Sequence, residues 1–249
     1  GDAELVKLIE QKRQSGVFLS VLGFGTGNTN DSMMEKLADK GNGNYSYIDS
    51  QAEARKALGA QVAGTLYTIA KDVKIQVEFN PAKVAGYRLI GYENRLLADR
   101  DFNDDKKDAG EIGAGHSVTA LYEIVPAGQK IENVGVDKLR YNQVHPSETA
   151  FGDELLTVKL RYKEPDKNDS KLLTTGLLDK ENTIENASDN LRFASAVAEF
   201  GLLLRESRYK GAASFENSAM LARAARGNDL KNYRNEFLGL LEKARRLNG

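Results

Sequence analysis

The chain has 249 residues, a formal net charge of −1 and no cysteine. Without cysteine it cannot hold a disulfide, a thiolate metal site or a cysteine nucleophile. The near-neutral charge offers no electrostatic footprint for nucleic acid, so we expect no nucleic-acid partner. No apolar run reaches the ~20 residues that a membrane-spanning helix needs, and we expect no transmembrane segment.

Residues 1–64 alternate between helical and strand patterns. Helical spacing of apolar residues predicts a first helix that ends near Gly16, and the continuous apolar run 17–22 predicts a strand buried on both faces of a parallel sheet. A glycine-rich turn, a helix from Asp31 to Gly41, a strand at 45–48 and a helix capped at Ser50 follow.

This rhythm is typical of an open α/β sheet. Two strands alone do not make a stable sheet of that kind, so we expect the earlier strands to lie outside this chain. The exposed sheet edge that this leaves favours pairing with a second copy, which predicts a homo-oligomer.

A β-rich region is predicted for residues 65–180, followed by a helical region at 188–249. Alternation of apolar and polar residues predicts an antiparallel, sandwich-like arrangement. The expected strands are 73–79, 87–92, 118–125, 155–162 and 171–174. The expected helices begin at Ser188, at Phe215 and at Asp229. We therefore predict an α/β domain at 1–64 and a second domain at 65–249.

Several segments carry a family resemblance. Residues 17–25, 30–38 and 42–45 resemble the last strands and helices of bacterial von Willebrand factor type A domains. Residues 87–95 and 113–123 resemble the C-terminal domain of unknown function that follows the type A domain in one group of bacterial envelope proteins. The resemblance covers nearly the whole chain.

The resemblance implies a partial Rossmann-like type A fold and a place in the bacterial cell envelope, periplasmic or at the surface. It also implies that a complete type A domain binds Mg²⁺ or Ca²⁺ through an Asp-x-Ser-x-Ser motif, a threonine and an aspartate. No matching positions occur in this chain. We therefore expect no cofactor here, and expect the metal to belong to upstream strands.

The glycine-rich turn after the first strand allows three interpretations. A dinucleotide site requires a third glycine where this chain has Asn28, and it disfavours the carboxylate of Asp31 at the helix start. A flexible turn without function is the second interpretation. The third is that Thr26, Asn28, Asn30 and Asp31 form a ligand rim, because loops at the carboxyl ends of strands line the crevice of such sheets.

An acidic loop opens like a calcium-binding loop, with oxygen-bearing side chains at Asp101, Asn103 and Asp105. The pattern then fails, because the sixth position has Lys106 instead of glycine and the twelfth has Ile112 instead of glutamate. A solvated loop is the favoured interpretation, and these three residues remain weak metal candidates.

Two histidines, His116 and His145, are the only imidazoles of the chain. No Gly-x-Ser-x-Gly elbow accompanies them. A hydrolase-like site around His116 and the loop from Asp101 to Asp105 is the alternative to a binding function. Convergence of these residues in one pocket would distinguish the two.

The terminal helices carry interleaved basic and acidic residues, which favours a solvated face. The basic ones are Arg192, Arg205, Arg208, Lys210, Arg223, Arg226, Arg234, Arg245 and Arg246. The leading prediction is therefore a non-enzymatic interaction or adhesion module that supports a metal-dependent type A domain and recognises a protein partner.

Overall fold

The structure is a computed structural model that describes residues 2–25, 30–91, 102–103, 109–129, 152–180 and 182–248. It divides into two compact units. Unit 1 comprises Gly1–Val77, Leu97–Val118 and Val158–Thr175, and unit 2 comprises Glu78–Leu96, Thr119–Thr157 and Gly176–Gly249. Strands β3, β7 and β8 contribute residues to both units.

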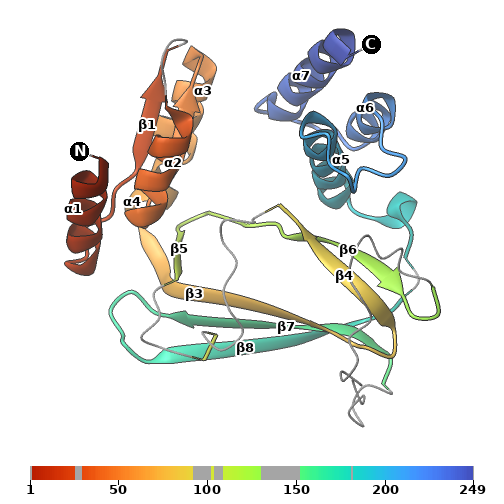
Figure 1. The fold of residues 1–249 in the computed structure, drawn as a ribbon, viewed down its shortest axis with the longest axis horizontal. Helices are drawn as coiled ribbons and strands as arrows, with labels where there is room; N and C mark the ends of the chain where they lie inside the picture. The colour runs from red at the N-terminus through yellow and green to blue at the C-terminus, as the bar shows by residue number, and fades with distance from the viewer. Residues whose placement is uncertain are drawn as a thin grey trace. The chain divides into compact units, whose positions relative to one another are not determined.

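Unit 1 begins with the predicted α/β segment (Figure 1). Its elements are α1 (Asp2–Gln14), β1 (Val21–Phe24), α2 (Asp31–Lys40), β2 (Tyr45–Ile48), α3 (Gln51–Arg55), the π-helical turn η1 (Lys56–Ala60) and α4 (Val62–Leu66). β1 and β2 pair in parallel, with Val21 opposite Tyr45 and Phe24 opposite Ile48. The mixed α/β class, the first two helices and the strand at 45–48 are confirmed.

Local capping explains where these helices begin. The Ser50 side chain accepts a hydrogen bond from the Glu53 amide at 3.2 Å, so α3 starts at the next residue as the sequence predicts.

After the end of α2, a Cβ on Gly43 would lie 1.8 Å from the Leu19 carbonyl oxygen. Only glycine permits this approach, which brings the end of α2 against the chain entering β1.

Two expectations for this segment are wrong in detail. The strand predicted at 17–22 forms only from Val21, and its Leu22 is 37% exposed, where burial on both faces was predicted. In the described residues β1 has only β2 beside it in the sheet, and α2 packs against it. The single helix predicted after Ser50 is interrupted by η1, where the hydrogen-bond register changes before α4.

The β-rich region contains two sheets. Its strands are β3 (Thr68–Phe79), β4 (Val84–Ile90), β5 (Gly110–Gly113), β6 (Leu121–Pro126), β7 (Glu154–Lys163) and β8 (Ser170–Leu178). One sheet has the order β5-β3-β7-β8, and the other pairs β4 with β6 in antiparallel register. The antiparallel β-rich character is confirmed. β5 was not predicted, because a four-residue segment with two glycines carries no strand pattern.

In unit 1, an irregularity in β3 positions a charged pair. The register shifts between Ala70 and Val73, and Asp72 there has a φ of 52°. This bulge lets the Asp72 carboxylate meet the Lys163 ammonium at 2.7 Å. Both side chains are largely shielded from solvent, so the pair ties β3 to β7.

In unit 2, aromatic rings join the end of β3 to the β4–β6 ribbon. The Phe79 ring stacks on Tyr87 with centroids 4.3 Å apart and meets the edge of Tyr122 at 5.4 Å. Desolvation in this cluster, with Tyr87 nearby, raises the pKa of Tyr122. The ribbon is thereby anchored on its aromatic side.

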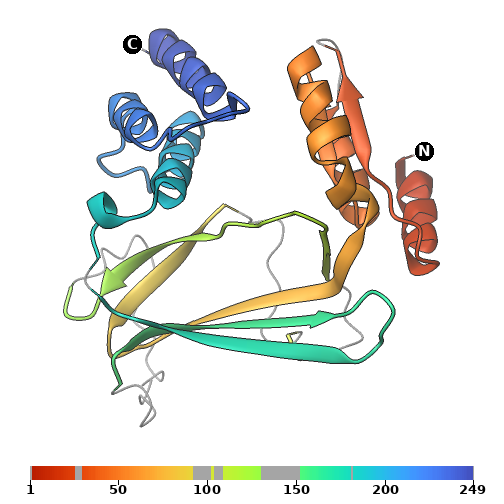
Figure 2. The same cartoon turned by 180° about the vertical axis from the view of Figure 1, so that it is seen from behind.

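The helices of unit 2 are α5 (Asp189–Leu204), α6 (Phe215–Ala224) and α7 (Tyr233–Asn248), seen from two sides in Figures 1 and 2. Ser188 caps α5, as the sequence predicts, and Ser214 caps α6. The third helix starts at Tyr233, later than the predicted Asp229. Asp229 instead accepts hydrogen bonds from the Arg234 and Asn235 amides, which lower its pKa although desolvation raises it.

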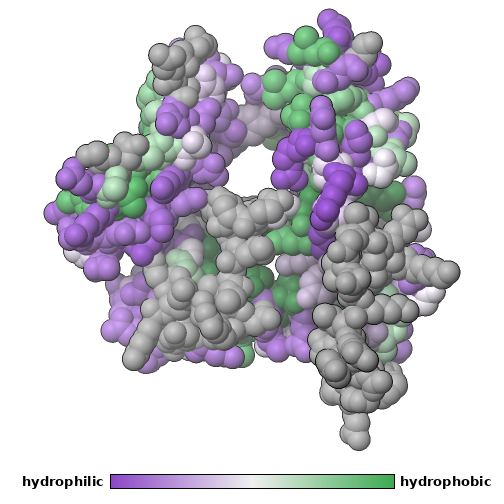
Figure 3. Space-filling view, in the orientation of Figure 1, coloured by the Kyte–Doolittle hydropathy of each residue, from purple (hydrophilic) through white to green (hydrophobic). Residues whose placement is uncertain are grey.

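The core of these helices joins aromatic rings to a small-residue face. Phe200 and Phe237 meet edge to face at 5.4 Å between α5 and α7. The buried residues of α6 and α7 are Ser218, Ala219, Ala222, Leu241 and Ala244, and Ala225 directly after α6 is buried as well. Figure 3 shows hydrophobic patches on the outside of these helices. Leu230, which precedes α7, and Leu247, near the end of α7, are both strongly exposed. Within the described ranges, no helix is long and apolar enough to span a membrane.

Candidate functional site

The predicted ligand rim is described only in part, because Thr26 and Asn28 lie outside the described residues. Asn30 is the N-cap of α2, and its side chain accepts hydrogen bonds from the Met33 amide at 3.2 Å and the Ser32 hydroxyl at 3.0 Å. This use of Asn30 satisfies an amide that would otherwise be unpaired at the helix start. The side chain is therefore held in place at the end of the β1–α2 loop.

Asp31 follows in the first turn of α2 and is engaged by β2. The Tyr45 hydroxyl donates a hydrogen bond to the Asp31 carboxylate, and this bond together with desolvation raises the pKa of Tyr45 to about 12. The tyrosine reaches Asp31 by crossing Gly23, where a Cβ would lie 3.0 Å from the Tyr45 hydroxyl oxygen. The first glycine of the turn thus provides space for this contact.

The structure brings Asn30 and Asp31 together at one helix start, next to a tethered loop. The Tyr47 hydroxyl donates to the Gly25 carbonyl at the end of β1, so two tyrosines of β2 fix the described part of the loop. Both rim side chains also serve the local structure. The ligand role of the rim stays a prediction.

Of the three weak metal candidates, the structure describes only Asn103, because Asp101 and Asp105 lie outside the described residues. The Asn103 side chain accepts a hydrogen bond from Arg161 at 3.2 Å, and the neighbouring Phe102 is buried beneath the same guanidinium. Across the part of the chain that the structure describes, no three His, Cys, Asp or Glu side chains gather into a metal-binding group.

His116 has a visible packing role. A Cβ on Gly64 would lie 2.3 Å from the His116 ring, so the exposed imidazole rests directly on the backbone of α4. Beside it, a Cβ on Gly113 would lie 1.5 Å from the Gly64 carbonyl oxygen. Two glycines therefore let α4 and β5 approach closely. His145, like Asp101 and Asp105, lies outside the described residues, so their convergence with His116 stays open.

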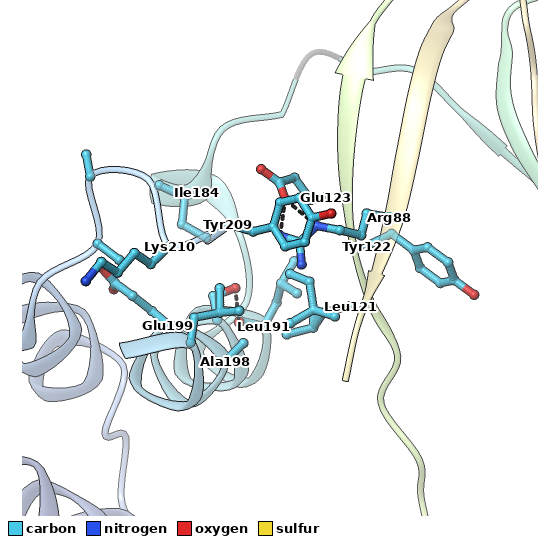
Figure 4. A pocket seen from close by; sticks show the side chains of 15 residues that line it. Arg88, Leu121, Tyr122, Glu123, Ile184, Leu191, Ala198, Glu199, Tyr209 and Lys210 are labelled. Atoms are coloured by element: carbon cyan, nitrogen blue, oxygen red, sulfur yellow. Dashed lines mark hydrogen bonds and ion pairs between the residues drawn. The ribbon is translucent and has the colours of Figure 1, made fainter. Parts of the chain in front are cut away.

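A concave site that the sequence did not predict lies within unit 2, between the β4–β6 ribbon and α5 (Figure 4). We call it the apolar hollow; its volume is about 460 Å³. Its apolar lining is Ile90, Leu121, Ile184, Leu191, Ala198, Leu202, Ala212 and Ala213, and its polar lining is Arg88, Tyr122, Glu123, Ser195, Glu199, Tyr209 and Lys210. The volume falls within the range of ligand sites.

Arg88 organises the edge of this hollow. It lies opposite Glu123 in the strand register, and its Nε donates to the Glu123 carboxylate at 3.1 Å, with a second bond from Nη2. The guanidinium also lies 4.1 Å from the centroid of the Tyr209 ring, which Figure 4 shows over the ion pair. Charge pairing and stacking together hold the guanidinium in a fixed plane.

A second hollow shares Arg88 and Tyr209 with the first. We call it the arginine hollow; it has a volume of about 390 Å³ and is lined by Arg88, Leu89, Arg205, Ser207, Arg208 and Tyr209. The Arg208 guanidinium lies 4.7 Å from the Tyr209 ring centroid. An apolar surface and a guanidinium-rich surface thus meet at one aromatic ring, an arrangement suited to a ligand with both apolar and anionic groups.

The sequence signals for this site were indirect. Arg205, Arg208 and Lys210 were recognised as part of an interleaved basic face, whereas Arg88 belongs to a strand more than a hundred residues earlier. Only the fold joins them. The apolar hollow is also lined by Ile184 and Leu191, which are 42% and 43% exposed.

Comparisons with known proteins identify relatives for most of the chain. The family model described as "Uncharacterized protein YfbK, C-terminal" matches residues 64–247. The chain is 44% identical over 240 residues to the uncharacterized protein YfbK of Escherichia coli (strain K12), covering 95% of this chain and 40% of that protein. It therefore spans less than half the length of this relative.

Two solved structures are similar to the chain, each with a TM-score below 0.5. The ArnB paralog VWA2 from Sulfolobus acidocaldarius gives a TM-score of 0.43 at 14% identity, covering 88% of this chain and 50% of that one. The von Willebrand factor type A protein from Catenulispora acidiphila gives 0.40 at 15% identity, covering 97% and 54%. The predicted resemblance to a C-terminal domain of unknown function agrees with the match to the YfbK C-terminal family and to YfbK itself. The relation to type A domains stays a prediction.

Proposed function

We propose that this chain, which belongs to the family described as the C-terminal part of the uncharacterized protein YfbK, is a non-enzymatic module that binds a protein partner. The partner site that we propose is the apolar hollow together with the arginine hollow. Since the relative is uncharacterized and longer than this chain, the activity of the whole protein belongs to the same proposal.

The observation that carries this proposal is the composition of the two hollows. Leu191 of α5 is 43% exposed and Ile184, in the 3-10 turn η5 (Ile184–Asn186), is 42% exposed, although burial of such apolar surface is favourable. An aromatic ring and arginines border them, which are the residue types enriched at the centres of protein interfaces. A protein segment seated here would cover the apolar lining.

Photo-crosslinking in the bacterium that makes the protein tests this function. A benzophenone amino acid replaces Ser195, which lines the apolar hollow, or Val197, which is exposed on the same helix but outside both hollows. We expect a discrete protein adduct from position 195 and none from position 197. Identical adducts from both positions, or none from position 195, would contradict the proposal.

A metal-dependent adhesive role of the longer protein is the finer part of the proposal. Mg²⁺ or Ca²⁺ would then bind to type A strands outside this chain, in the bacterial cell envelope, with Thr26, Asn28, Asn30 and Asp31 at the rim. Calorimetric titration of both cations into this chain and into a form extended to the whole type A domain tests it. Binding by the extended form alone supports the proposal, whereas binding by this chain would direct attention to Asp101, Asn103 and Asp105.

The rim has its own test in the extended form. Asn28→Ala and Asp31→Ala should each weaken the metal-dependent binding of a protein partner by the extended form, and unchanged affinity in both variants would remove the rim from the proposal. The predicted homo-oligomer through the sheet edge at β1 and β2 is checked by light scattering, where a monomer would count against it.

A further inference from the structure

We propose that the two hollows together recognise an acidic segment of the partner in which an aliphatic or aromatic side chain neighbours an aspartate or glutamate. This inference rests on the proposed protein-binding function and adds the chemistry of the bound segment. The apolar side chain would enter the apolar hollow, and the carboxylate would meet the arginine hollow.

The charges that line the two hollows favour an anionic ligand. Arg88, Arg205, Arg208 and Lys210 line them, against Glu123 and Glu199. Of the acidic side chains, Glu123 is engaged by Arg88, and Glu199 accepts a hydrogen bond from the Ser214 amide at 3.0 Å. Each carboxylate thus already has a donor in the fold, and the two hollows are lined by more basic than acidic side chains.

The arginines keep donors for a ligand while they hold their present partners. A guanidinium carries five N–H donors in a planar fork, and Arg88 uses those on Nε and Nη2 for Glu123. Arg208 donates through Nη2 to the Tyr209 hydroxyl. The other donors of these planar groups match the two oxygens of a carboxylate. Stacking on Tyr209 fixes both planes before a ligand arrives, which reduces the entropy lost on binding.

The position of Tyr209 explains why apolar and acidic groups must be adjacent in the ligand. The ring borders both hollows, so a segment that fills the apolar hollow places its next residues over the arginines. A peptide is favoured over a membrane surface, because the carboxylates of Glu123 and Glu199, which line the apolar hollow, would repel a continuous layer of anionic headgroups. A single carboxylate can avoid them.

Selection from a displayed library of random heptapeptides against the whole chain tests this inference. We expect enriched peptides to pair an acidic residue with an aliphatic or aromatic neighbour. Fluorescence anisotropy should then show affinity reduced at least about tenfold in Arg208→Glu. It should be unchanged in Arg246→Glu, which makes the same charge change at an exposed position of α7 outside both hollows.

Glu123→Gln provides a gain-of-affinity test, because it removes the negative charge that is paired with Arg88, and the acidic peptides should bind several-fold more tightly at low salt. Circular dichroism of each variant establishes that it is folded. Enrichment of neutral or basic peptides that still crosslink at position 195 would overturn the acidic chemistry and leave the protein-binding function standing. Arg208-dependent binding to phosphatidylglycerol vesicles without peptide enrichment would overturn both.

Discussion

Replacing Leu241 with alanine should destabilise the C-terminal helices by about 3–5 kcal/mol. Leu241 is 0% exposed, and its helix packs against α6, whose buried face is formed by Ala219, Ala222 and Ser218. These small side chains have no further atoms that could move into the space left by the leucine. The cavity therefore stays open, which places the cost in the upper part of the range for buried leucines.

The neighbouring residue provides the control. Leu240 is 51% exposed on the same helix, so Leu240→Ala should cost less than about 1 kcal/mol. Urea denaturation followed by circular dichroism gives the free energy of unfolding of both variants. Equal losses of unfolding free energy in the two variants would mean that α7 does not present Leu241 to a packed core.

Three further predictions concern other parts of the chain. Asp31→Asn should lower the pKa of Tyr45 from about 12 toward the ordinary value of 10. The raised pKa contributes stability that is complete below pH 10 and is lost as the pH rises toward 12, and the variant should lack this contribution. NMR titration of the ring carbon of Tyr45 checks this, and an unchanged pKa would contradict the contact with Asp31. Ser218→Ala should stabilise the chain by about 1 kcal/mol, because Ser218 Oγ is buried without a hydrogen-bond partner among the described residues; a lower melting temperature would show that the hydroxyl is satisfied. Gly113→Ala should lower the free energy of unfolding by at least about 2 kcal/mol, because its Cβ would lie 1.5 Å from the Gly64 carbonyl oxygen. An unchanged free energy of unfolding in thermal denaturation would mean that α4 does not approach β5 this closely.

The sequence predicted best where the signal is local. The predicted start of α2 near Asp31 and the predicted strand at 45–48 agree with the structure, where the cap at Asn30 directly precedes α2. Ser188 likewise marks the start of α5. These elements are specified by neighbours in the chain, so their positions need no knowledge of the tertiary structure.

Features that depend on close approach or on distant residues were missed. The pairing of β5 depends on Gly64 and Gly113 meeting across fifty residues, and no periodicity records it. The junction of the two hollows requires Arg88 from a strand to stack on Tyr209 beyond α5. The ligand rim was proposed from the position of a loop, whereas the structure adds the tyrosines that hold that loop.

The most direct test of the account is the affinity of the partner identified by crosslinking for two variants of α5. Ala198→Trp fills the apolar hollow, whereas Val197→Trp adds the same side chain at an exposed position outside it. Calorimetry should show affinity reduced at least about tenfold by Ala198→Trp and unchanged by Val197→Trp. Unchanged affinity in the Ala198→Trp variant, with the helices intact, would contradict the claim that this hollow is where the protein binds its partner.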